Sequence, residues 1–184
     1  FLLIRGASES AKANAIMVLI KLAVLIFFSV IALTAFNADN FADFMPNGTS
    51  GVTAAAGAIF FTFIGLDAVS TAGDEVKNPQ KALPIALLSA LVIVILIYLL
   101  VAVSALGTQP WTAFSDPDQS EAGLSKILEM VTGNTWPGTV LAIGAVISIF
   151  SVTLVTMYGQ TRILFAIGRD GLLPKTFAKV NSRT

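Results

Sequence analysis

The sequence of 184 residues contains no cysteine and no histidine, and only 12% of its residues are charged. The absence of cysteine excludes disulfides and leaves no redox chemistry from which to infer a compartment. The absence of histidine removes the most common metal ligand and the residue that most often carries protons near neutral pH. We therefore predict no metal site and no cofactor. The formal net charge is zero, which gives no support to nucleic-acid binding.

Hydrophobic residues are abundant instead: they make up 55% of the chain, and the mean hydropathy is +0.84. A soluble domain usually has about 25% charged residues, roughly twice the share found here. This composition predicts an all-α membrane protein, because helices pair their own backbone groups in hydrocarbon. The chain begins with Phe1 and lacks a signal-peptide pattern, so we expect an interior piece of a longer protein.

Four apolar stretches, separated by polar segments, are long enough to cross a bilayer. We predict one partial transmembrane domain over residues 1–184, with spans at about 12–36, 52–76 (broken near 61–67), 83–107 and 137–160. Within the connection that follows the third span, residues 123–131 have the spacing of a short amphipathic helix lying on one face of the protein.

The basic residues predict how these spans are oriented. Nine of the eleven lysines and arginines lie in or directly beside three segments, 1–11, 77–82 and 161–184. The positive-inside rule places these segments in the cytoplasm. Segments 37–51 and 108–136 are then extracellular.

The second span contains an unusual sequence, I-F-F-T-F-I-G-L-D at residues 59–67. Gly65 weakens a helix, and an acid such as Asp67 is costly inside a membrane and usually functional. A broken spanning helix is tolerated where its freed backbone groups face a cavity or a ligand. We predict a discontinuous helix around a substrate site. The alternative is a packing stripe of aromatic residues with a tolerated glycine.

Four segments together resemble one known family. They are L-I-K-L-A-V at 19–24, F-F-T-F-I-G-L-D-A-V at 60–69, D-E-V-K-N-P-Q-K-A-L-P at 74–84 and G-Q-T-R-I-L-F-A-I-G-R-D-G-L-L-P at 159–174. The chain resembles the amino acid–polyamine–organocation (APC) superfamily of permeases, most closely its cationic-amino-acid-transporter-like branch. The resemblance implies the fifth to eighth transmembrane helices of a transporter with two inverted repeats and broken helices.

The same resemblance implies a function for the full-length protein. It would be a secondary active transporter in the plasma membrane, moving an amino acid by alternating access with protons as the coupling ion. Its partners would be the substrate, protons, the lipid bilayer and the other helices of the same protein.

The resemblance also implies a substrate site at the break. The backbone carbonyls of Phe61, Thr62 and Ile64, next to Gly65, would bind the ammonium group of the substrate, with the Phe61 ring as a gate. The negative end of a helix dipole and its unpaired carbonyls suit a cation. The apolar side chains of Phe61, Phe63 and Ile64 favour substrates with neutral side chains.

Lys21 is the first candidate for proton coupling. It lies nine residues beyond Lys12, about 13 Å into the membrane, which is too deep for easy snorkelling. Its amine must find partners inside the protein or lose its proton. In proton-coupled members of the family, a lysine on the matching helix occupies the place of a sodium ion. The alternative is a permanently charged structural strut.

Ser151 and Asp67 are the other two candidates. The resemblance aligns Ser151 with a hydroxyl that lines an ion site in sodium-coupled relatives, although hydroxyls in membrane helices commonly bond to their own backbone. The family often carries an acid at the position of Asp67, which is thought to sense protons in some members. Alternatively, Asp67 caps the second half of the broken helix.

Two other classes of function remain at this point. A channel-like or non-transporting assembly also uses broken helices and predicts no saturable uptake. An intramembrane aspartyl protease needs two carboxylates that share a site. No second acid lies inside any predicted span, so we predict that the protein is not an enzyme.

Overall fold

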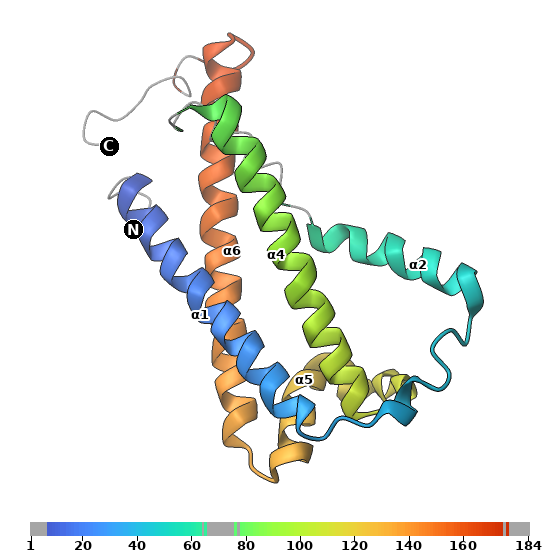
Figure 1. The fold of residues 1–184 in the computed structure, drawn as a ribbon. Coiled ribbons are helices and arrows are strands. Elements are labelled where there is room, and N and C mark those ends of the chain that lie inside the picture. The colour runs from blue at the N-terminus through green and yellow to red at the C-terminus, as the bar shows by residue number, and fades with distance from the viewer. Residues whose placement is uncertain (1–6, 64, 66–75, 77, 175, 177–184) are drawn as a thin grey trace. The chain divides into compact units, whose positions relative to one another are not determined.

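The computed structural model describes residues 7–63, 65, 76, 78–174 and 176. These residues form helices and turns with no strand, which confirms the all-α prediction (Figure 1). In chain order the elements are α1 (Ala7–Leu33), the 3₁₀ turn η2 (Ala38–Phe41), α2 (Gly48–Phe60), the 3₁₀ turn η3 (Phe61–Phe63), α4 (Pro79–Thr108), the 3₁₀ turn η5 (Trp111–Ser115), α5 (Pro117–Thr132) and α6 (Trp136–Arg169).

Three of these helices, α1, α4 and α6, are long and apolar enough to cross a membrane. They contain 27, 30 and 34 residues, and about 20 residues suffice to span the hydrocarbon core. The segment Gly48–Phe63 is apolar but shorter. The chain is therefore part of an integral membrane protein, and the fourth span stays a prediction.

All three long helices extend beyond the predicted spans, and α1 begins at Ala7, five residues before its predicted span. Helix α4 begins at Pro79, where a proline in the first turn costs no hydrogen bond. Asn78 precedes it with a φ of 55°, and its carbonyl accepts from the amides of Lys81 and Ala82 at 3.1 and 3.0 Å. Helix α6 continues past residue 160 to Arg169, with basic residues toward its C-terminal end.

The described residues divide into two compact units, which we treat separately. One comprises Phe1–Leu19, Ile64–Ala90 and Ser148–Thr184, and the other comprises Ile20–Phe63 and Leu91–Ile147. We call them the first and the second unit. Each of the long helices contributes one part to each unit.

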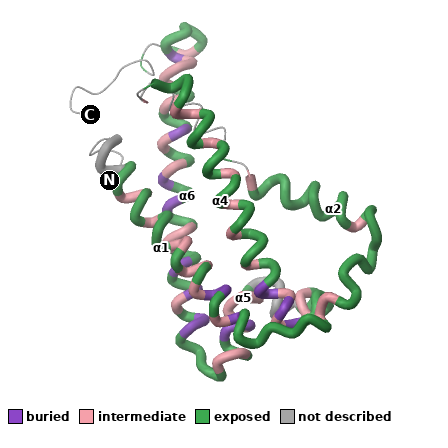
Figure 2. The backbone as a smooth tube through the Cα atoms, viewed as in Figure 1, coloured by how far each residue is buried: buried purple, intermediate pink, exposed green. Residues whose placement is uncertain are grey.

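The core of the second unit is a cluster that we call the end cluster. It gathers buried residues from α1, α4, α5 and α6. Figure 2 colours the backbone purple at buried positions around α5. Its members are Phe28, Ala32, Ala105, Ile127, Leu128 and Leu141. The helix that the sequence predicted over residues 123–131 is present within α5. Its apolar face supplies Ile127 and Leu128, both fully buried, so α5 is part of the core and not only a surface helix.

Backbone hydrogen bonds close the same end of the second unit. The carbonyl oxygen of Gly107 accepts from the amide of Asn37 at 2.8 Å and from Nδ2 of Asn40 at 2.9 Å. The hydroxyl of Thr108 donates to the carbonyl of Ala32 at 3.3 Å. These bonds tie the end of α1 and the segment that follows it to the C-terminal end of α4, so both helices hold this loop.

Candidate functional site

The predicted substrate site falls where α2 loses its α-helical geometry. The α-helix ends at Phe60, and Phe61–Phe63 continue as a 3₁₀ turn. The hydroxyl of Thr62 donates to the carbonyl of Ile59 at 2.7 Å. Gly65 has a φ of 120°, a conformation that residues with a side chain rarely adopt. A helix end therefore lies inside an apolar run. Gly65 allows the turn beyond it, because glycine has no Cβ and tolerates a positive φ.

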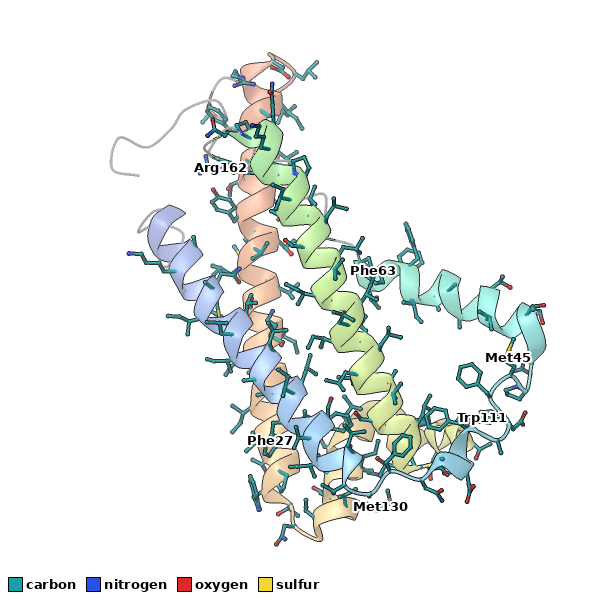
Figure 3. All side chains as sticks on the ribbon, in the orientation of Figure 1. Phe27, Met45, Phe63, Trp111, Met130 and Arg162 are labelled. Carbon is teal, nitrogen blue, oxygen red and sulfur yellow. The ribbon has the colours of Figure 1, made fainter. Side chains whose placement is uncertain are left out.

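Two aromatic pairs surround this helix end. The rings of Phe60 and Phe61 meet edge to face with centroids 6.0 Å apart, and both are about 70% exposed within the chain. The ring of Phe63, labelled in Figure 3, meets Tyr98 of α4 edge to face at 5.8 Å. Phe63 thus anchors the turn on α4, while Phe61 points its ring away from the packed part of the unit. Sequence reasoning missed Tyr98, because nothing in the pattern says which helix receives Phe63.

Tyr98 also lines an apolar cavity of about 500 Å³ within the second unit. Its walls come from α1, α4, η5 and α5, and include Leu25, Val101, Ala105, Phe114 and Leu124. Apart from the hydroxyl of Tyr98, the side chains that line this cavity are apolar. Among the described residues, no group of histidine, cysteine and acidic side chains could hold a metal.

Two of the three candidates for proton coupling lie on described helices, Lys21 on α1 and Ser151 on α6. Lys21 is half-buried in α1. Ser151 of α6 is buried, with 2% of its surface exposed, and its hydroxyl donates to Oδ1 of Asn14 in α1 at 2.6 Å. A hydrogen bond of this kind between membrane helices contributes about 0.6 kcal/mol on average and up to about 1.7 kcal/mol. Sequence reasoning did not single out Asn14, although it is a polar residue in an apolar run.

Two of the predicted site residues, Ile64 and Asp67, lie outside the described residues. Of the others, Phe61 and Thr62 lie together at the end of α2, and Gly65 forms the turn that follows. The assignment of these residues to substrate binding and proton coupling stays a prediction.

The model of the amino acid permease family matches residues 1–184, the whole chain. The chain belongs to this family. The resemblance predicted from its motifs is confirmed, and the permease belongs to the APC group that those motifs indicated.

Curated relatives agree with the family. The chain is 39% identical over 183 residues to the branched-chain amino acid permease BcaP of Bacillus subtilis (strain 168), covering 100% of this chain and 38% of the relative. It is 38% identical over 177 residues to a methylthioribose transporter of the same organism, covering 96% and 37%. It is 36% identical over 182 residues to cationic amino acid transporter 9, chloroplastic, of Arabidopsis thaliana, covering 97% and 31%.

These relatives bear on two further predictions. They are named as permeases or transporters, which confirms that the protein is not an enzyme and leaves no support for an aspartyl protease. The permease chain spans less than two-fifths of the length of each of the three relatives. What the whole protein carries, and how, is therefore a matter for proposal.

Proposed function

We propose that the full-length permease is a secondary active transporter that moves a neutral amino acid by alternating access. The observation that carries this proposal is the end of α2 inside an apolar run, followed by a 3₁₀ turn and by Gly65 at positive φ. Carbonyl groups at such an end, together with the negative end of the helix dipole, attract a cation. The backbone at Phe61, Thr62, Ile64 and Gly65 then binds the substrate ammonium group.

The relatives suggest which substrates to compare. One is named for branched-chain amino acids, one for methylthioribose and one for cationic amino acids. A helix end that attracts a cation favours a substrate with an ammonium group, which methylthioribose lacks. The exposed ring of Phe61 and the half-buried ring of Phe63 lie near this helix end, and their apolar character favours a neutral side chain over a cationic one.

The test is uptake of labelled leucine, valine, arginine and methylthioribose by the full-length protein in proteoliposomes. We expect saturable and stereoselective uptake, with leucine or valine preferred. Preference for methylthioribose would contradict the ammonium site, and flux that never saturates would favour a channel-like assembly.

We further propose that transport is symport with protons, with Lys21, Asp67 and Ser151 as the coupling residues. The support is the depth of Lys21 in α1 and the burial of Ser151 in α6. A half-buried amine in a membrane helix must be paired or lose its proton, so it is suited to alternate between the two. With an imposed pH gradient, Lys21→Ala should abolish accumulation of the substrate, and sodium should not replace the gradient for the unmodified protein. Full accumulation by Lys21→Ala would refute this role.

The plasma membrane is the location that we propose, with residues 1–11, 77–82 and 161–184 in the cytoplasm. The distribution of lysine and arginine supports this orientation. Single cysteines at Asn40 and Gln119 should react with an impermeant thiol reagent from outside sealed cells, and one at Asn78 should not. Labelling at Asn78 alone would show that the orientation is the opposite of the proposed one.

A further inference from the structure

The turn at the end of α2 is attached to α4 through one aromatic side chain. Every residue from Val52 to Thr62 is exposed within the chain, whereas Phe63 is half-buried. The ring of Phe63, labelled in Figure 3, meets the ring of Tyr98 edge to face with centroids 5.8 Å apart. Both residues belong to the second unit, so this contact lies within one compact unit. The Phe63–Tyr98 pair therefore fixes the end of a long exposed stretch to α4.

The position of Phe63 determines how the neighbouring carbonyl group points. A peptide bond is planar, so the carbonyl of Thr62 and the Cα of Phe63 lie in the same plane. A displacement of Phe63 consequently turns the Thr62 carbonyl. On the other side of the turn, the Thr62 hydroxyl donates to the carbonyl of Ile59 at 2.7 Å. The turn is thus attached to its own helix through Thr62 and to α4 through Phe63.

Tyr98 is suited to a contact that forms and breaks. It is 42% exposed within the chain, and it also lines the apolar cavity of about 500 Å³ in the second unit. A ring beside open space is not enclosed by close packing, as a core side chain would be. An aromatic pair of this geometry shifts an equilibrium by only about two- to tenfold. The contact can therefore bias the turn toward one conformation without locking it there.

We infer that Tyr98 is a positioning residue for substrate binding. Through Phe63 it holds the turn η3 in the conformation in which the carbonyls of Phe61 and Thr62 bind the substrate ammonium group. This inference rests on the proposed function, in which these carbonyls form the ammonium site. Tyr98 acts through Phe63 and does not touch the substrate. Without the contact a smaller fraction of the protein is competent to bind, and the apparent affinity falls by that fraction.

The experiment measures uptake of labelled L-leucine by the full-length protein in proteoliposomes, over a range of leucine concentrations. It gives the concentration for half-maximal uptake and the maximal rate, and the thermal unfolding midpoint is measured in detergent. The variants are Tyr98→Ala, Phe63→Ala and the double variant. Tyr98→Phe retains the ring, and Leu99→Ala removes an exposed side chain on a different side of α4. Should Tyr98→Ala fail to fold, Tyr98→Leu removes the ring while keeping an apolar wall for the cavity.

We expect Tyr98→Ala to raise the concentration for half-maximal uptake by about two- to tenfold. The maximal rate should fall less than about twofold, because saturating substrate draws the turn back into its binding conformation. Tyr98→Phe and Leu99→Ala should resemble the unmodified protein. The double variant should raise the half-maximal concentration no further than Phe63→Ala alone, since Tyr98 acts through Phe63.

Four results would overturn the inference. If the unmodified protein takes up leucine saturably and Tyr98→Ala leaves the half-maximal concentration unchanged, the proposed function stands and Tyr98 does not position the site. A lower unfolding midpoint in that case would show a structural role only. If the increases multiply in the double variant, Tyr98 does not act through Phe63. If Tyr98→Phe is as impaired as Tyr98→Ala, the hydroxyl matters and the ring contact does not. If the unmodified protein takes up neither leucine nor any other amino acid, the proposed function fails, and this inference fails with it.

Discussion

Two parts of the second unit, the end cluster and helix α2, both carry apolar side chains and differ in how far the chain covers them. The end cluster buries Phe28, Ile127 and Leu128 completely. In α2, all of whose residues are described, no residue is buried, and Phe60 and Phe61 are about 70% exposed. The end cluster is complete within this chain, whereas α2 leaves its apolar surface for lipid or for the rest of the permease.

This difference separates the part that holds the fold from the part that we propose binds substrate. A substrate site must open and close, and such elements come from the less stable parts of a protein. The end cluster has both buried side chains and hydrogen bonds between distant segments. At α2, the described anchor is the contact of Phe63 with Tyr98. Substitutions in the two regions should therefore change different properties.

The largest difference in stability should follow from truncating one side chain in each region. Leu128→Ala removes a fully buried side chain, and we expect a loss of about 2–5 kcal/mol in the free energy of unfolding. Phe61→Ala removes a ring that the chain leaves exposed, and we expect less than about 0.5 kcal/mol. Unfolding of the full-length protein in detergent measures both. Equal losses would mean that the remaining helices bury Phe61 as deeply as α5 buries Leu128.

A matched pair of glycines gives the next largest effect. A Cβ at Gly144 of α6 would lie 2.8 Å from Val24 Cγ1 of α1, and valine is stiff about χ1. Gly144→Ala should therefore force these helices apart and cost about 1–3 kcal/mol. A Cβ at Gly57 of α2 meets nothing within 4 Å, so Gly57→Ala should stabilise the helix by up to about 1 kcal/mol. The thermal unfolding midpoint should fall for Gly144→Ala and rise for Gly57→Ala. Shifts in the same direction would contradict the contrast between a packed α6 and an uncovered α2.

These contrasts also show what the sequence predicts and what it leaves open. Hydropathy located the three long helices, and Gly65 predicted irregular backbone near the end of α2, because both signals are local. The spacing of Leu124, Ile127 and Leu128 predicted a helical face but not that α1, α4 and α6 would cover it. The pairing of Asn14 with Ser151 joins residues 137 positions apart, and no local pattern encodes such a partner.

The proposed substrate site offers a comparison between neighbours. Phe60 and Phe61 are equally exposed within the chain and touch each other, but successive residues point to different sides of a helix. We expect Phe61→Ala to reduce the rate of uptake by about tenfold, equivalent to about 1.4 kcal/mol, and Phe60→Ala to reduce it less than twofold. The carbonyls survive either change, so the concentration for half-maximal uptake should move less than the rate. Equal effects of the two variants would mean that Phe61 is a packing residue and not a gate.

The smallest contrast concerns single hydrogen bonds. Asn40→Ala removes a 2.9 Å bond from Nδ2 to the carbonyl of Gly107, which joins segments 67 residues apart in the end of the second unit. The Gly107 carbonyl keeps the amide of Asn37 as a donor at 2.8 Å, so no acceptor is left unpaired. We therefore expect a loss of only about 1 kcal/mol in the free energy of unfolding.

Thr62→Val removes a 2.7 Å bond from the Thr62 hydroxyl to the carbonyl of Ile59, within the exposed turn η3. Water or a neighbouring group can then donate to that carbonyl, so the expected loss is below about 0.5 kcal/mol. Unfolding of the two variants under identical conditions measures the difference. If Thr62→Val costs more than Asn40→Ala, the turn at the end of α2 is held more firmly than its exposure indicates, and the division between a closed region and an open one does not hold.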